Sequence, residues 1–154
     1  MPKIELIQGD CLEKMKDIPD KSIDMILCDL PYGTTACKWD TIIPFEPLWE
    51  QYKRIIKDNG AIVLTASQPF TSALVMSNIK WFKYEMIWNK DLCKNPGLAK
   101  IRPLPSFENI LVFGNGKTTY NPQMEKGKPY TDIRKQPTKV HNGNEHKYDF
   151  QEIL

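Results

Sequence analysis

The chain has 154 residues, of which 41% are hydrophobic and 26% are charged, and its formal net charge is +2. This length and composition are typical of one globular domain and exclude an intrinsically disordered chain. The sequence contains no apolar run of about 18 residues, so a membrane span is not expected. Its N-terminus lacks the apolar segment of a secretory signal, which predicts a cytoplasmic protein.

The cysteines predict neither a metal centre nor a disulfide framework. None belongs to a Cys-x-x-Cys pair, and both histidines, His141 and His146, lie far along the chain from every cysteine. Zinc sites use closely spaced Cys and His ligands, and disulfides are rare in reducing compartments. We therefore expect no bound metal and four ordinary thiols, which are Cys11, Cys28, Cys37 and Cys93.

Positive charge is concentrated in the middle of the chain. Residues 80–102 carry six Lys/Arg against two Asp/Glu and also hold four aromatic residues. Basic residues interleaved with aromatics suit a nucleic-acid surface, but aromatics also favour strands, and charges often form a solvated face. Charge alone favours the second interpretation. The candidate DNA contacts in and near this segment are Lys90, Lys94, Lys100 and Arg102.

The first thirty residues predict a strand, a short helix and a second strand. Residues Lys3–Gln8 are apolar enough for a short strand. Asp10 is a plausible N-cap for a helix that runs to about Lys16, with Glu13 completing a capping box. The apolar run Ile23–Cys28, bounded by polar turns, predicts a buried parallel strand.

A second helix–strand–helix unit follows a loop rich in Pro, Gly and Thr. A helix opens at Pro44, because apolar residues then recur at spacings of three and four. Asn59-Gly60 predicts its C-cap. Ala61–Ala66 reads as another buried strand and Pro69–Asn78 as another helix.

The remaining strands are expected to form an antiparallel edge. They are Phe82–Trp88 and Asn109–Phe113, and Asn115-Gly116 is a hairpin signal. Strands that alternate with helices through residue 80 predict an α/β, Rossmann-like fold with a largely parallel sheet. Neither a GxGxxG fingerprint nor a P-loop motif is present.

The tetrapeptide Asp29-Leu30-Pro31-Tyr32 directly follows a predicted strand, where open α/β sheets bind ligands. The carboxylate of Asp29 and the carbonyl of Leu30, kept extended by the proline, can each accept a hydrogen bond from an exocyclic amino group. Tyr32 offers an aromatic face on which a base can stack. The same residues also occur in ordinary strand-to-turn transitions, so the pattern alone leaves both interpretations open.

The stretch Gly9–Gly33 resembles the opening of the DNA amino-methyltransferases that modify adenine N6 or cytosine N4, in their permuted β class. Leu30 stands where many members carry proline, a variant similar to phage and prophage members. The similarity extends over roughly residues 4–130. It continues through Trp49, Arg54–Lys57, Asn59–Ile62, Asn95, Lys100–Leu104 and Phe107–Phe113.

The resemblance implies methyl transfer from S-adenosylmethionine to the amino group of a base flipped out of double-stranded DNA, with adenine N6 favoured. Asp29, Leu30, Pro31 and Tyr32 would form the catalytic set. Asp10 is a candidate cofactor contact, although a helix N-cap is at least as good an account of it.

The glycine-rich cofactor motif of these enzymes is not found before or after the tetrapeptide. We therefore expect an incomplete methyltransferase fold, with a catalytic part at residues 1–116 and an extended segment at 117–154 that opens the target-recognition region. A second polypeptide, or a C-terminal half, would supply the cofactor loop, and this chain alone would be inactive. A homodimer is a further expectation.

Two alternatives remain. A degenerate methyltransferase-like module would bind DNA or protein without catalysis, and the missing cofactor motif favours it. The intact tetrapeptide argues against it. An unrelated α/β domain would carry the tetrapeptide by coincidence, which the ordered matches after residue 40 disfavour.

Overall fold

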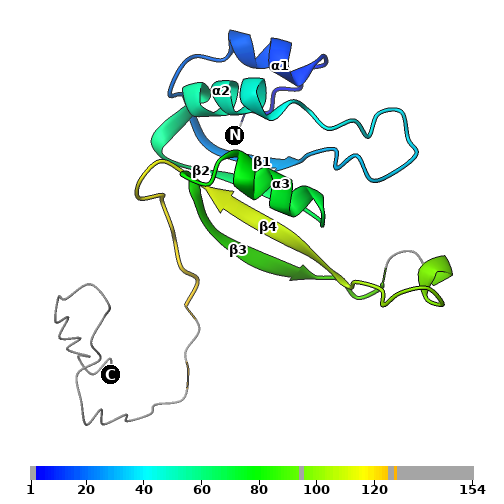
Figure 1. Cartoon of the computed structure of the whole chain (residues 1–154). Helices are drawn as coiled ribbons and strands as arrows, with labels where there is room; N and C mark the ends of the chain where they lie inside the picture. Colours follow the sequence, from blue (N-terminus) through cyan, green and yellow to red (C-terminus); the bar gives the residue numbers. More distant parts are fainter. Residues whose placement is uncertain (1–2, 94–95, 125–126, 128–154) are drawn as a thin grey trace. The chain divides into compact units, whose positions relative to one another are not determined.

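The computed structural model describes residues 3–93, 96–124 and 127. The chain divides into two units, Met1–Tyr120 and Asn121–Leu154, and every element below belongs to the first. In chain order (Figure 1) they are α1 (Cys11–Lys14), the 3-10 turn η1 (Met15–Asp17), β1 (Ile23–Asp29), α2 (Phe45–Ile55), β2 (Ile56–Ala66), α3 (Phe70–Ser77), β3 (Phe82–Asn89), the 3-10 turn η2 (Pro96–Leu98) and β4 (Phe107–Phe113).

Four strands form one mixed sheet in the order β1-β2-β4-β3. β1 and β2 are parallel and are joined through α2, while β4 runs antiparallel to both β2 and β3. Figure 1 shows β3 and β4 side by side below the parallel pair. This is the Rossmann-like α/β sheet with an antiparallel edge that the sequence predicts. Its outer strands are β1 and β3.

The core lies on the face of the sheet that the helices cover. Ile62 and Leu64 of β2 and Phe113 of β4 are fully buried there. The Trp49 ring of α2 lies 4.9 Å from the Phe113 ring, and Leu74 of α3 is fully buried beside them. Each such side chain contributes roughly 1.5–3 kcal/mol on burial, so this face holds the unit together.

The opposite face is largely bare of helices. Direct register places Leu27, Val63, Val112 and Tyr84 in one row across the sheet, and Asp29, Thr65, Ile110 and Met86 in the next. In the first row Val112 is buried and Val63 is partly buried, whereas Leu27 and Tyr84 at its two ends are exposed. We call five exposed apolar residues of this side the open face, namely Met25, Leu27, Tyr84, Met86 and Trp88, whose exposed fractions run from 43% to 67%.

Two of the expected strands differ from the structure. Lys3–Gln8 forms no strand, because no described strand lies beside it to pair with, and Ile4, Leu6 and Ile7 are exposed. Ile23–Cys28 forms β1 and extends to Asp29, but it lies at the sheet edge and is not buried. A strand with one neighbour keeps one row of backbone groups unpaired.

Two predicted turns also differ from the structure. Asn59-Gly60 does not cap α2, because β2 begins directly at Ile56 and includes both residues. A Cβ atom at Gly60 would lie 2.8 Å from the Asp24 carbonyl oxygen of β1, so glycine here allows close strand approach. Asn115-Gly116 forms a bend with a positive φ at Gly116, but no strand follows it within residues 117–124.

Candidate active site

The carboxylate of Asp29 lies at the carboxyl end of β1, opposite Thr65 of β2. The Thr65 hydroxyl donates a hydrogen bond to Asp29 Oδ1. The Tyr32 hydroxyl lies 2.8 Å from the same Oδ1 and 2.9 Å from Thr65 Oγ1. Among the residues that the structure describes, none donates to Asp29 Oδ2. One oxygen of the carboxylate is thus held in place, and the other remains available to a ligand.

The Tyr32 ring packs between the end of the sheet and α3. It stacks on Phe70 with ring centroids 5.2 Å apart and planes 22° apart. Partial burial, partly offset by the Thr65 hydroxyl, raises the pKa of Tyr32 to about 12. The phenol therefore stays protonated at neutral pH and can donate its hydrogen bond. Phe70 covers one ring face of Tyr32.

The loop after the tetrapeptide is organised by Asp40. Its carboxylate accepts hydrogen bonds from the backbone N–H groups of Gly33 (2.8 Å), Thr34 (2.9 Å) and Thr35 (2.7 Å). Hydrogen bonds from the Thr35 hydroxyl and these N–H groups lower the pKa of Asp40 to about 2. Gly33 has a φ of +67°, a conformation that favours glycine. Asp40 therefore anchors the loop that leads away from Tyr32.

The candidate cofactor contact Asp10 acts as the N-cap of α1. Its Oδ1 accepts a hydrogen bond of 2.8 Å from the Leu12 backbone N–H. The expected capping box does not form, because Glu13 pairs with Lys16 instead, at 2.8 Å. Asp10 thus has a structural role in this chain, and its role as a cofactor contact stays a prediction.

The candidate DNA contacts lie in different settings. Lys90 is engaged within the protein, because its Nζ lies 2.8 Å from Glu108 and 3.6 Å from the Trp88 ring centroid. Lys100 and Arg102 are exposed in the loop between β3 and β4. Lys94 lies outside the described residues. Their part in DNA binding stays a prediction.

Thr65 and Phe70 are not among the site residues that the sequence predicts. Thr65 ends a strand that was expected, and the carboxyl ends of neighbouring parallel strands meet at one edge of a sheet. That rule, applied to Ile23–Cys28 and Ala61–Ala66 together, could have placed Thr65 beside Asp29. No sequence signal marks Phe70 as the stacking partner of Tyr32.

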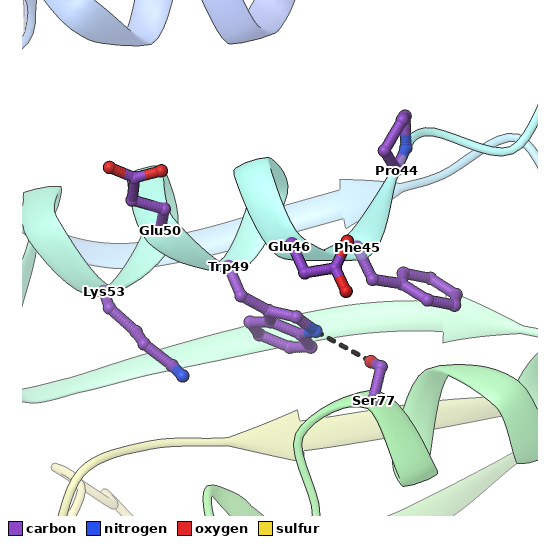
Figure 2. Close-up of a pocket in the computed structure, with 7 residues that line it drawn as sticks. All are labelled: Pro44, Phe45, Glu46, Trp49, Glu50, Lys53 and Ser77. Carbon is purple, nitrogen blue, oxygen red and sulfur yellow. Dashed lines mark hydrogen bonds between the residues drawn. The ribbon is translucent and has the colours of Figure 1, made fainter.

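Two surface cavities are described near the helices. The larger, about 480 Å³, lies between α2 and α3, where Trp49 Nε1 donates to Ser77 Oγ at 2.7 Å (Figure 2). The smaller, about 300 Å³, is lined by residues of α3 and β3. Neither cavity is lined by Asp10 or by any of residues 29–32. These two cavities therefore lie away from the tetrapeptide.

No group of three or more His, Cys, Asp or Glu side chains among the described residues is placed to hold a metal ion. In the same part of the chain, no helix is long and apolar enough to cross a membrane.

The mixed α/β sheet, with its helices, matches the Rossmann-like fold of methyltransferases. A sequence model described as DNA methylase, of the N6/N4 methyltransferase type, matches residues 23–154. This chain belongs to that family, whose enzymes are S-adenosylmethionine-dependent methyltransferases.

Three individual proteins illustrate the likeness. The chain is 31% identical to the type II methyltransferase M.HinfI of Haemophilus influenzae, over 55% of this chain and 31% of that protein. The M1.HpyAVI–SAM complex superposes with a TM-score of 0.57 at 20% identity, over 79% of this chain and 61% of the other. The cytosine-N4-specific PvuII DNA methyltransferase gives 0.52 at 14%, over 71% and 48%. The chain thus spans about a third of the curated relative's length.

Proposed function

We propose that this chain provides the target-base site of a DNA amino-methyltransferase. In this proposal, residues 29–32 hold the exocyclic amino group of a base that has been flipped out of double-stranded DNA. The observation that carries the proposal is the geometry of Asp29, whose Oδ1 is held by Thr65 and Tyr32 while none of the described residues donates to Oδ2.

The proposed chemistry needs only positioning by these residues. Asp29 Oδ2 accepts one hydrogen of the amino group and the Leu30 carbonyl accepts the other, which orients the nitrogen lone pair for in-line attack. The base stacks on the face of Tyr32 that Phe70 leaves open. S-adenosylmethionine supplies the methyl group when it is bound. The favoured acceptor is adenine N6, with cytosine N4 as the alternative.

The chain by itself is proposed to be inactive. Asp10 is already used as a helix cap, and the described cavities do not reach the tetrapeptide. In this proposal the chain provides a place for the base but only part of a place for the cofactor. A second polypeptide, or a C-terminal half, would supply the rest.

A second candidate function is a methyltransferase-like module that binds DNA or protein without catalysis. The incomplete cofactor site favours this candidate. The ordered hydrogen bonds around Asp29 favour the first, because a module that only binds has no need to keep one carboxylate oxygen free.

The test is transfer of a radiolabelled methyl group from S-adenosylmethionine to DNA, followed by digestion to nucleosides. We expect no transfer by the chain alone. We expect transfer when the part of M1.HpyAVI outside the matched region is added, and its loss in Asp29→Asn with the fold retained. Label in N6-methyl-2′-deoxyadenosine or in N4-methyl-2′-deoxycytidine identifies the acceptor. A labelled product that Asp29→Asn leaves unchanged would refute the proposed site.

A further inference from the structure

The smaller cavity, between α3 and the edge strand β3, is polar at one end and apolar at the other. Four residues on one face of α3 line it at helical spacing, namely Thr71, Ser72, Val75 and Met76. β3 supplies Phe82 and Glu85. The chain turns back after α3, and the Phe82 N–H donates to the Asn78 carbonyl, so Phe82 lies near the apolar, C-terminal end of the helix. Hydrogen bonds place Glu85 at the polar end.

The carboxylate of Glu85 is held by a buried chain of hydrogen bonds. The Thr71 hydroxyl donates to Asn109 Oδ1 at 3.2 Å, and Asn109 Nδ2 donates to Glu85 Oε2 at 3.1 Å. Thr71 and Asn109 are only 4% and 7% exposed. A carboxylate can only accept, so it fixes the amide nitrogen of Asn109 toward Glu85 and the amide oxygen toward Thr71. One oxygen of Glu85 therefore has a defined position at the cavity.

The polar end of the cavity offers acceptors for hydrogen bonds. No described residue donates to Glu85 Oε1, and none of the ion pairs within the described part of the chain includes Glu85. The Ser72 hydroxyl donates to Gln68 Oε1 at 2.9 Å, as the Thr71 hydroxyl does to Asn109. Each hydroxyl thus uses its only hydrogen within the protein, and its oxygen can only accept from a ligand.

We infer that this cavity binds a primary alkylammonium group. Such a group is a compact cation with three donors, and the polar end provides three acceptor oxygens, on Glu85, Thr71 and Ser72. A guanidinium fits less well, because it pairs best with both oxygens of one carboxylate and Asn109 already occupies Glu85 Oε2. The site is separate from the proposed base site, since residues 29–32 do not line it.

The apolar end of the cavity sets the length of the alkyl chain. Val75 and Met76 lie one helical turn beyond Thr71 and Ser72, which is about 6 Å along the axis and the span of about five carbon atoms. The cavity volume of about 300 Å³ has room for such a chain. Met76 is 70% exposed, so a bound chain would remove apolar surface from water. A free alkylamine and a lysine side chain share this chemistry.

The test is a titration of the full 154-residue chain with n-pentylammonium, followed by NMR of the labelled methyl groups of Val75 and Met76. We expect saturable shifts of these methyl groups, with a dissociation constant on the order of 1 mM. In the series from ethylammonium to pentylammonium, each methylene should tighten binding by about two- to fourfold. n-Pentylguanidinium should bind several-fold more weakly than pentylammonium.

A pair of matched variants locates the head group. Glu85→Gln removes the charge but keeps an oxygen that can accept from Asn109, and it should weaken pentylammonium binding by about tenfold or more. Glu46→Gln is the control, because Glu46 is an exposed carboxylate that lines the other cavity. It should bind the probe as the native chain does. The backbone amide spectrum shows whether each variant keeps the fold, and the chain-length series needs no variant.

Nα-acetyl-lysine methylamide distinguishes the two sources of the ammonium group. Binding like that of pentylammonium supports a lysine side chain of a partner protein, whereas its failure beside a binding pentylammonium supports a free amine. Three results would overturn the inference. The methyl groups could show no saturable shift at about 50 mM pentylammonium, Glu85→Gln could bind as tightly as Glu46→Gln, or pentylguanidinium could bind as tightly as pentylammonium.

Discussion

The two faces of the sheet carry similar apolar side chains but are covered to very different extents. On the helix-covered face, Leu64 and Phe113 are fully buried. On the open face, Leu27 and Met86 are 67% and 46% exposed, although their strands pair with those that carry Leu64 and Phe113. Strand composition alone therefore does not show which face of the sheet forms the core. The elements that are available to cover each face decide it.

The sharpest test of this difference compares one truncation on each face. Leu64→Ala removes a fully buried side chain and should lower the free energy of unfolding by about 2–5 kcal/mol. Leu27→Ala makes the same chemical change at 67% exposure and should cost within about 0.5 kcal/mol. Urea unfolding followed by circular dichroism measures both. Equal losses would mean that something covers the open face in solution.

A polar contact should provide the next largest effect on the helix-covered side. Arg54 of α2 donates to the carbonyl of Met15 at 2.6 Å and to that of Ile18 at 2.8 Å, and so fastens η1 to α2. Arg54→Met should lower the free energy of unfolding by about 1.5–3 kcal/mol, because both carbonyls lose the charged donor and the Met15 carbonyl keeps only the Ile18 backbone N–H.

The Arg54 variant has a conservative control. Arg54→Lys keeps the charge but cannot make both hydrogen bonds at once, so it should lie between the native chain and Arg54→Met. Hydrogen exchange of residues 11–17 shows whether the loss is local. If Arg54→Met unfolds at the same urea concentration as the native chain, these contacts contribute nothing.

Local sequence patterns predicted most helices and strands and the antiparallel edge, but not the strand register or the contacts between segments. The Pro44 helix follows from its apolar periodicity, and the Pro69 helix and the strands at residues 82 and 109 follow from the local sequence of each segment. Asn59-Gly60 was assigned to a turn because its local preference is strong, whereas the structure uses Gly60 to bring β2 close to β1. Pairing across the sheet overrode the local signal.

The candidate site shows the same limit. Asp29 and Tyr32 are three residues apart, so their sequence alone marked them together. Thr65 and Phe70 reach the same place only through strand register and through the packing of α3, which involve residues more than thirty positions away. Lys3–Gln8 was predicted as a strand from composition, and that prediction failed because a strand also requires a neighbour.

In the loop that follows Tyr32, Asp40 should make the protein sensitive to acid. Its pKa is lowered to about 2, so its hydrogen bonds stabilise the fold above the unfolded value near 4. This contribution is lost as the pH falls from about 4 through about 2. Melting temperature measured across this range should fall less steeply in Asp40→Asn than in the native chain. Identical slopes would show that Asp40 does not anchor the loop.

The smallest effect expected is a change in the pKa of Tyr32, the residue through which the site contacts both faces of the sheet. Asp29 and Thr65 lie on the same side of the sheet as the open face, whereas Tyr32 stacks on Phe70 of the helix-covered side. The folded chain should contain a tyrosine with a pKa of about 12, which a tyrosinate absorbance titration detects and which Tyr32→Phe removes. Because burial is the main cause, Phe70→Leu should lower this pKa toward 10.

The stability that is linked to the raised pKa of Tyr32 is complete below pH 10 and is lost as the pH rises through 12. If Tyr32 titrates near 10 while the chain is folded, the ring is not packed against α3, and the open face of the sheet continues through the site.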